Sequence, residues 1–190
     1  MKKIKFPSSI KKRLINGFTL VELLIVVIIL AILAAIVVPQ FASTTDDAKL
    51  ASVDSTLSNV RGAIDLYYQQ HGAYPGSVTA VPSAACAGTS GTGVATGGAG
   101  ATAVTAFQDQ LSLYTDAKGG ACSISDTTNH KFGPYMKKAT LPADPITNVA
   151  TLTVIAAGNL NMTATGTVGG WLYDSKTGKF IMNHTTYQTR

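Results

Sequence analysis

Hydrophobic residues are concentrated in one block near the start of the chain. From Phe18 to Val38 the sequence runs for 21 residues, of which only Thr19 and Glu22 are polar, and neither Gly nor Pro interrupts it. As a helix rising 1.5 Å per residue, this block would be about 31 Å long, which matches the hydrocarbon thickness of a bilayer. Because the helix is apolar on every side beyond Leu23, it has to be buried all round. We therefore expect residues 18–38 to be able to span a membrane.

After Pro39 the apolar positions follow helical spacing instead. Steps of 4, 3, 4 and 3 separate the members of one apolar stripe, Val53, Leu57, Val60, Ile64 and Tyr67. Polar residues occupy the opposite side, so the pattern predicts that the helix continues to about residue 70. Residues 39–72 would form its amphipathic half, which Gly72 ends before the loop at Tyr74-Pro75-Gly76.

Residues 73–190 have the composition of a globular body that contains one insertion. Gly, Ala, Ser, Thr and Val dominate residues 77–102, which we expect to form an inserted loop. A second short helix, ending at Gly119-Gly120, is predicted by four apolar residues at steps of 3, 4 and 3: Val104, Phe107, Leu111 and Tyr114.

The end of the chain has the pattern of strands. Residues 151–156 are rich in β-branched side chains, and residues 170–173 and 179–182 flank a segment of hairpin composition. The face that packs on the helix stripe would contain four large side chains, Trp171, Tyr173, Phe180 and Met182. These elements favour an α+β fold, in which a long N-terminal helix packs on a small antiparallel C-terminal sheet.

The formal net charge of +5 belongs to the beginning of the chain. Before residue 18 there are six basic residues and no acidic one: Lys2, Lys3, Lys5, Lys11, Lys12 and Arg13. The remainder has nine basic and ten acidic residues, so its formal balance is −1 and gives no basis for nucleic-acid binding. Positive charge before an apolar span places the N-terminus in the cytoplasm and the body outside.

Two cysteines, Cys86 and Cys122, are present. An exported body with two cysteines favours one disulfide, and the alternative is a pair of free buried thiols. Closing the 37-residue segment between them would stabilise the fold by about 3.8 kcal/mol in the chain-entropy model, less any native strain.

Three interpretations compete for the apolar block: a removable secretory signal, a plain membrane anchor, and a prepilin leader followed by a filament helix. A secretory signal has a shorter apolar core followed by small residues, yet the first A-x-A sequence here is Ala85-Cys86-Ala87. A plain anchor gives no reason for Glu22, since an ionised carboxylate at the centre of a bilayer costs about 2.5 to 3.5 kcal/mol.

The stretch Asn16-Gly17-Phe18-Thr19-Leu20-Val21-Glu22-Leu23-Leu24, after a basic leader and before an unbroken apolar helix, resembles the N-terminus of type IV prepilins and type II secretion pseudopilins. The resemblance implies that residues 1–17 are a leader, which a prepilin peptidase removes by cutting between Gly17 and Phe18. It also implies methylation of the new Phe18 amine. The family's glutamate, fifth in the mature chain, corresponds to Glu22.

In a filament, Glu22 can meet the N-terminal amine of a neighbouring subunit. A lone carboxylate in an apolar bundle is costly whereas a paired one is not, so this pairing would set the register in which subunits are added. The alternative is that Glu22 only interacts favourably with the dipole at the start of its own helix.

A second resemblance lies in the body. Gly133-Pro134-Tyr135-Met136-Lys137-Lys138, with Leu141-Pro142-Ala143-Asp144-Pro145, is similar to the connector into the sheet of major type II pseudopilins. The chain departs from that pattern at Ile146-Thr147-Asn148, and the acidic calcium loop of those proteins is missing. Asp144 and Asp174 alone do not make a calcium site, and we expect no metal or other cofactor.

No pattern of catalytic residues is present. His71, His130 and His184 are scattered without metal-ligand spacing, and no Ser or Cys lies in a nucleophile motif. We therefore expect a structural subunit that polymerises with copies of itself, through a separate assembly platform and ATPase. It most resembles a type II secretion pseudopilin, and a type IV pilus pilin for adhesion, motility or DNA uptake is the alternative.

Two other classes remain open, a membrane-anchored extracytoplasmic binding domain and an enzyme. The resemblance places the protein in the bacterial cytoplasmic membrane as a single-pass protein with a cytoplasmic N-terminus. After assembly it would lie in a periplasmic or cell-surface filament.

Overall fold

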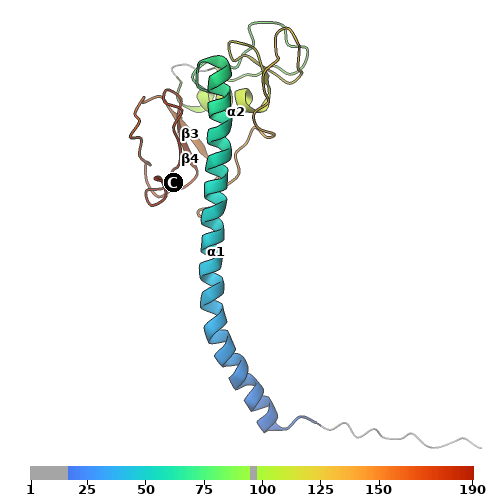
Figure 1. Ribbon diagram of the computed structural model, residues 1–190, viewed down its shortest axis with the longest axis vertical. Helices are drawn as coiled ribbons and strands as arrows, with labels where there is room; N and C mark the ends of the chain where they lie inside the picture. The colour runs from blue at the N-terminus through green and yellow to red at the C-terminus, as the bar shows by residue number, and fades with distance from the viewer. Residues whose placement is uncertain (1–16, 95–97) are drawn as a thin grey trace, which may run out of the picture. The chain divides into compact units, whose positions relative to one another are not determined.

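The computed structural model describes residues 17–94 and 98–190. Apart from Gly17, the predicted leader therefore lies outside the described residues. The chain divides into two compact units between Thr45 and Asp46, and the long helix α1, Leu20–His71, runs from one unit into the other (Figure 1). The helix begins and ends close to the bounds that the sequence predicts.

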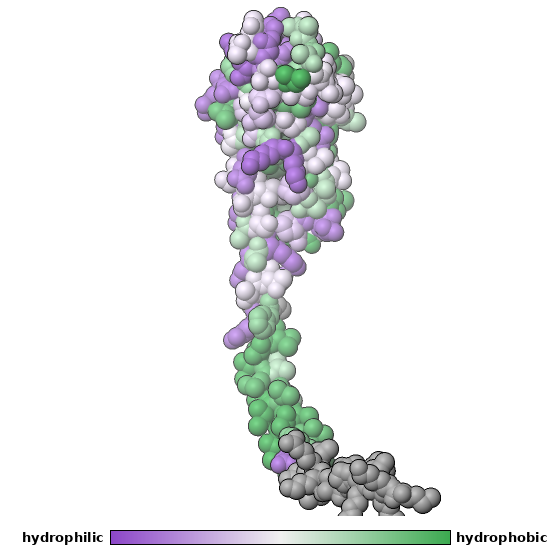
Figure 2. Space-filling model, turned by 90° about the vertical axis from the view of Figure 1, so that its right-hand side faces the viewer, coloured by the Kyte–Doolittle hydropathy of each residue, from purple (hydrophilic) through white to green (hydrophobic). Residues whose placement is uncertain are grey.

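In the first unit, no described residue covers the apolar part of α1. Leu20–Val38 is 19 residues long, is apolar enough to cross a membrane, and has none of its length buried. Its side chains form the continuous green surface of Figure 2. This exposure agrees with the expectation that the segment is buried by something other than its own body.

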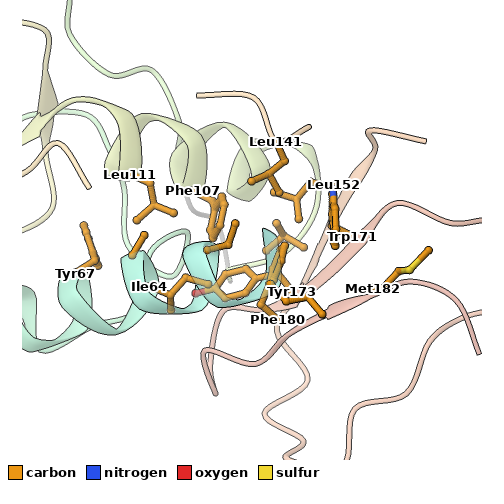
Figure 3. Close-up of a cluster of buried hydrophobic side chains, with 14 of the residues drawn as sticks. Ile64, Tyr67, Phe107, Leu111, Leu141, Leu152, Trp171, Tyr173, Phe180 and Met182 are labelled. Atoms are coloured by element: carbon orange, nitrogen blue, oxygen red, sulfur yellow. The ribbon is translucent and has the colours of Figure 1, made fainter. Parts of the chain in front are cut away.

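In the second unit, the amphipathic part of α1 forms one wall of the hydrophobic core. All five residues of the predicted stripe are at most 2% exposed. They pack with the second helix α2, Ala101–Ser112, and with the C-terminal sheet. Figure 3 shows large side chains from all three elements meeting in this core, among them Ile64, Phe107, Trp171, Tyr173 and Phe180.

The C-terminal sheet has the strand order β3-β4-β5, formed by Leu152–Ile155, Trp171–Asp174 and Phe180–Met182. These strands lie where the sequence predicts them, and β4 and β5 form the expected antiparallel hairpin. The sheet is mixed rather than wholly antiparallel, because β3 runs parallel to β4 with Leu152 opposite Trp171. Parallel neighbours need a connection of a dozen or more residues, and residues 156–170 provide it. The class is α+β, as predicted.

Two buried carboxylates hold the ends of this crossover connection. Asp174 accepts hydrogen bonds from the N–H groups of Gly158 and Asn159 at its start, at 2.8 and 3.1 Å. Asp144 accepts one from the N–H of Gly170 at its end, at 2.8 Å, and others from the segment that includes Thr147. Both aspartates are fully buried, and N–H donors satisfy their charge.

The pKa of Asp144 reflects a balance between burial and hydrogen bonding. Burial by itself raises the pKa of this carboxyl, but hydrogen bonds from the Thr147 side chain, from the N–H of Thr147, and from the N–H groups of Gly170 and Ile146 lower it. The hydrogen bonds outweigh burial, so the pKa lies below its ordinary value. Asp144 therefore stays ionised inside the fold.

A second, two-stranded sheet follows α2. Its strands are β1, Tyr114–Thr115, and β2, Ala121–Cys122, which pair antiparallel. The prediction of a helix through Tyr114 to Gly119 was wrong at this point, because α2 ends at Ser112 and Leu113 is extended. The pairing of Tyr114 with Cys122 replaces the last helical turn.

Gly178 shows why the hairpin between β4 and β5 needs glycine. Its φ of 74° is left-handed, and a Cβ at this position would lie 2.2 Å from the ring of Tyr74. Its N–H donates to the Asp174 carbonyl at 2.8 Å and closes the turn. Only glycine meets both requirements without moving the aromatic side chain.

Gln110 links α2 to two loops. It is fully buried, its Oε1 accepts the N–H of Gly76, and its Nε2 donates to the carbonyls of Val78 and Gly119, at distances between 2.7 and 3.1 Å. This amide satisfies backbone groups in the segment before α2 and in the segment after it. Nothing in the helical pattern of the sequence indicated it.

We predict that Gln110→Leu destabilises the body more than the same substitution at Gln108. The substitution leaves three backbone groups unpaired, each at a cost of about 1 to 3 kcal/mol, so we expect a loss of about 2 to 4 kcal/mol after partial relaxation. Urea unfolding of the full chain in detergent measures it. Gln108→Leu, half-buried on the same helix, is the matched control, and equal midpoints for the two variants would contradict the prediction.

Candidate functional site

The predicted processing site lies immediately before α1. Gly17 and Phe18 precede the first helical residue, and Phe18 is 80% exposed. A Cβ placed on Gly17 would meet no described atom within 4 Å.

Thr19 and Glu22 together cap the first turn of α1. Glu22 Oε2 accepts hydrogen bonds from the N–H and the hydroxyl of Thr19, both at 2.8 Å, and Thr19 Oγ1 accepts the N–H of Glu22 at 3.2 Å. This reciprocal arrangement is a capping box. An N-cap of this type stabilises a helix by about 0.5 to 2 kcal/mol.

The capping box gives Glu22 a role within its own chain. The two partners predicted from sequence for this carboxylate, a neighbour's amine and the helix dipole, did not include Thr19. The spacing T-x-x-E in Thr19-Leu20-Val21-Glu22 is the signal that indicates it. Both hydrogen bonds from Thr19 end on Oε2, and no described residue donates to Oε1 or forms an ion pair with Glu22. The carboxylate is thus held in place with one oxygen open.

Cys86 and Cys122 form the expected disulfide. The Cα atoms are 5.7 Å apart, and Cys122 is buried in β2. Around the bond the inserted segment pairs with the body, since Gly91 donates its N–H to the Ala121 carbonyl at 2.7 Å and Ser90 forms a β-bridge with Cys122. Backbone pairing as well as the disulfide therefore anchors the insertion.

Asp109 on α2 adds a further anchor for the insertion. Its Oδ2 accepts the N–H groups of Thr92 and Gly93, at 2.8 and 3.1 Å. At Gly93 the insertion passes so close to α2 that a Cβ would lie 2.1 Å from the nitrogen of Ala106. Around residues 88–93 the inserted loop is thus closely packed on the body.

Metal-binding chemistry finds no support in the described parts of the chain. Residues 17–94 and 98–190 contain no group of three or more His, Cys, Asp or Glu side chains that could hold a metal ion. Asp144 and Asp174 each accept backbone N–H groups, and they bind different segments of the crossover connection.

The N-terminal segment of the chain is similar to segments of known proteins. A family model described as the prokaryotic N-terminal methylation motif matches residues 12–38. The chain is 43% identical over 65 residues to type II secretion system core protein G of Pseudomonas aeruginosa, covering 34% of this chain and 46% of that protein. It is 54% identical over 48 residues to a type IV narrow pilus major component of Thermus thermophilus, covering 25% and 41%.

A fimbrial protein of Neisseria meningitidis serogroup B is 38% identical over 64 residues, or 34% of this chain and 38% of that protein. These matches span less than half the length of the relatives, and no solved structure is significantly similar to the chain. The chain thus carries a prepilin-type methylation motif and is similar to pseudopilins and type IV pilins. The names of these relatives describe components of pili, fimbriae and a secretion system rather than enzymes.

We predict that reduction of the disulfide lowers the stability of the body. Freeing the 37-residue loop should cost up to about 3.8 kcal/mol by the chain-entropy estimate. Alkylation of the denatured protein before reduction should label no thiol, and thermal unfolding should occur at a lower temperature with reductant. A Cys86→Ser, Cys122→Ser double variant should not respond to reductant. Two labelled cysteines in protein from the cell surface would contradict the prediction.

Proposed function

We propose that this protein is a structural subunit of a type IV pilus-like filament, and that it most resembles a type II secretion pseudopilin. The observation that carries the proposal is the exposed apolar helix Leu20–Val38, which begins at a methylation motif and continues into a folded body. A surface of this kind requires cover on all sides. A bilayer covers it before assembly, and the same helices of neighbouring copies cover it in the filament.

In this proposal, residues 1–17 are the leader and residues 18–38 are the membrane and filament segment. Residues 39–72 join that segment to the body at 73–190. The peptidase cuts after Gly17 and methylates the Phe18 amine, and the exposure of Phe18 supports access to the bond. The chain crosses the bacterial cytoplasmic membrane once with its N-terminus inside, because the basic leader precedes the span.

The Phe18 amine of a neighbouring subunit is the proposed partner of Glu22. Thr19 orients the carboxylate through Oε2, which leaves Oε1 for the amine. Among apolar helices an unpaired carboxylate is costly, so the addition of a subunit in the correct register is favoured over addition in any other. The capping box would support this pairing by holding the side chain in one orientation.

Small side chains on the amphipathic part of α1 are consistent with close packing between copies. The exposed side of the helix between residues 48 and 62 includes Ala48, Ala51, Ser52, Ser55, Ser58 and Gly62. Gly62 costs the helix about 1 kcal/mol relative to Ala, and a Cβ there would meet no described atom within 4 Å. The body itself therefore does not require glycine at this position.

Two kinds of filament fit the proposal. The connector at Gly133–Lys138 and the likeness to core protein G favour a secretion pseudopilus. The Cys86–Cys122 disulfide and the missing acidic loop favour a surface pilus. In either case the partners are copies of this chain, the peptidase, and an assembly platform with its ATPase. The less favoured alternative is a membrane-anchored binding domain, whose apolar helix would remain in the bilayer.

We predict that Gly17→Trp leaves the full-length precursor in the membrane. The large side chain would obstruct the peptidase on the leader side of the bond, where glycine leaves space. Mass spectrometry of the membrane fraction measures the result, and Ser8→Trp, within the leader but away from the bond, is the control. A mature mass that begins at Phe18 in the Gly17 variant would contradict the proposed processing.

We predict that Glu22→Gln is inserted and cleaved normally but yields few or no filaments. Glutamine retains an oxygen that can accept the Thr19 hydrogen bonds, so it keeps the capping box and removes only the charge. Thr19→Val is the complementary variant, because it loses the cap hydroxyl and retains the carboxylate. Electron microscopy measures filament yield, and an immunoblot measures the mature subunit.

The two variants separate pairing from capping. If the charge sets the register, Glu22→Gln should assemble as poorly as Glu22→Ala, while Thr19→Val retains partial assembly. Normal filaments from a fully processed Glu22→Gln protein would show that the charge is not needed, and the pairing would then have to be abandoned. The filament proposal itself would survive this result, because apolar packing could still hold the helices together.

A further inference from the structure

His71 lies at the junction of three segments in the second unit. It is the last residue of α1, and its ring is 4.1 Å from that of Tyr67, measured between centroids. Phe132 meets the imidazole edge-on at 5.2 Å, and the ring of Tyr135 lies 6.2 Å away. A half-buried imidazole is thus enclosed by aromatic rings from α1 and from the segment 132–135.

One ring nitrogen connects all three segments. Nε2 of His71 lies 3.0 Å from the hydroxyl oxygen of Tyr135 and 3.0 Å from Oγ1 of Thr115 in β1. The Tyr135 hydroxyl donates to Oε1 of Gln70 at 2.6 Å, which leaves its oxygen free to accept a hydrogen bond from the Nε2–H of His71. The neutral imidazole with its proton on Nε2 therefore fits this arrangement.

Few charges face the imidazole. Tyr67 and Tyr135 present phenol groups, which are neutral at physiological pH. Asp116, which follows β1, presents a carboxylate, but its Oδ1 already accepts the N–H groups of Lys118 and Gly120, at 2.8 and 2.9 Å. From the remaining segment, Lys131 lies over the Phe132 ring, 5.4 Å from its centroid, and adds positive charge. The residues around His71 thus supply little negative charge to stabilise a protonated imidazole.

We propose that His71 is an acid-sensitive latch, which joins the end of α1 to β1 and Tyr135 while neutral and releases the segment 132–136 when protonated. Protonation adds a second N–H to a half-buried ring among aromatic side chains, where water solvates the charge only in part. Opening of the segment exposes the ring and lets water solvate the imidazolium. The latch is independent of the filament proposal, because it concerns the body alone.

Burial of His71 also favours opening of the latch when the imidazole is protonated. It lowers the pKa of His71 from its ordinary value, while the backbone at Ala117 and the charge of Asp116 oppose the shift only in part. The opened state, with an ordinary imidazole, therefore binds the proton more tightly than the closed state. The free energy that neutral His71 contributes to the closed state is fully present above about pH 6.5. It decreases as the pH falls from there toward the lower pKa that His71 has in the closed state.

Amide hydrogen exchange of the full chain in detergent, with the disulfide intact, tests the latch at pH 7.5 and 5.0. The reporters are the N–H of Thr115, bonded to the Phe132 carbonyl, and the N–H groups of Tyr135 and Met136, both bonded to the Leu111 carbonyl. After correction for intrinsic exchange, the opening constant should rise by up to about tenfold per pH unit below 6.5. Amides of β4 should change less.

His71→Gln should abolish this pH dependence, because glutamine still forms hydrogen bonds but does not titrate. His184→Gln should retain it, and this variant is the control. Should His71→Gln fail to fold, the His71 ring resonances of the wild-type protein provide the test, since the ring should titrate below pH 6.5 together with the loss of amide protection. Equal protection at both pH values, or unchanged pH dependence in His71→Gln, would overturn the latch.

Discussion

The apolar surface of Leu20–Val38 is the constraint on which the rest of the molecule depends. An apolar helix that no described residue covers is not stable in water, so this segment needs lipid or other helices around it. The only polar side chains between Phe18 and Val38, those of Thr19 and Glu22, satisfy each other at its first turn. A polar start and an apolar length let one segment lie in lipid or among other helices, because the Thr19 hydrogen bonds to Oε2 of Glu22 need no other chain.

The same helix organises the body. Its stripe from Val53 to Tyr67 is buried against α2 and the C-terminal sheet, and each large apolar side chain removed from water contributes about 1.5 to 3 kcal/mol. Arg61, on the border of that stripe, donates its Nε–H to the Phe180 carbonyl at 3.0 Å and covers a backbone acceptor of the edge strand β5. One helix thus supplies the apolar segment, a wall of the core and a cover for the edge of the sheet.

Sequence periodicity located the elements whose folding is local. The helix stripe, the three C-terminal strands and the hairpin around Asp174 follow from spacing and turn residues, and the structure places them as expected. The direction of β3, the short strands β1 and β2, and the amide of Gln110 could not be predicted, because they depend on partners distant in sequence. At the candidate site the T-x-x-E spacing was visible, but the arrangement of Thr19 and Glu22 needed the structure.

Two groups in the body respond to acid in separate pH ranges, which follows from their different surroundings. Burial lowers the pKa of His71, and Asp116 offsets the shift only in part, so this residue's contribution to stability decreases as the pH falls below about 6.5. Asp144 accepts several N–H donors, which lower its pKa. Its contribution to stability is therefore kept until the pH falls below about 3.9, the pKa of an aspartate in an unfolded chain. Because Asp144 holds the crossover that makes β3 parallel to β4, the C-terminal sheet should persist over a range in which the His71 junction has already opened. The body would therefore loosen at the end of α1 before it loses its sheet.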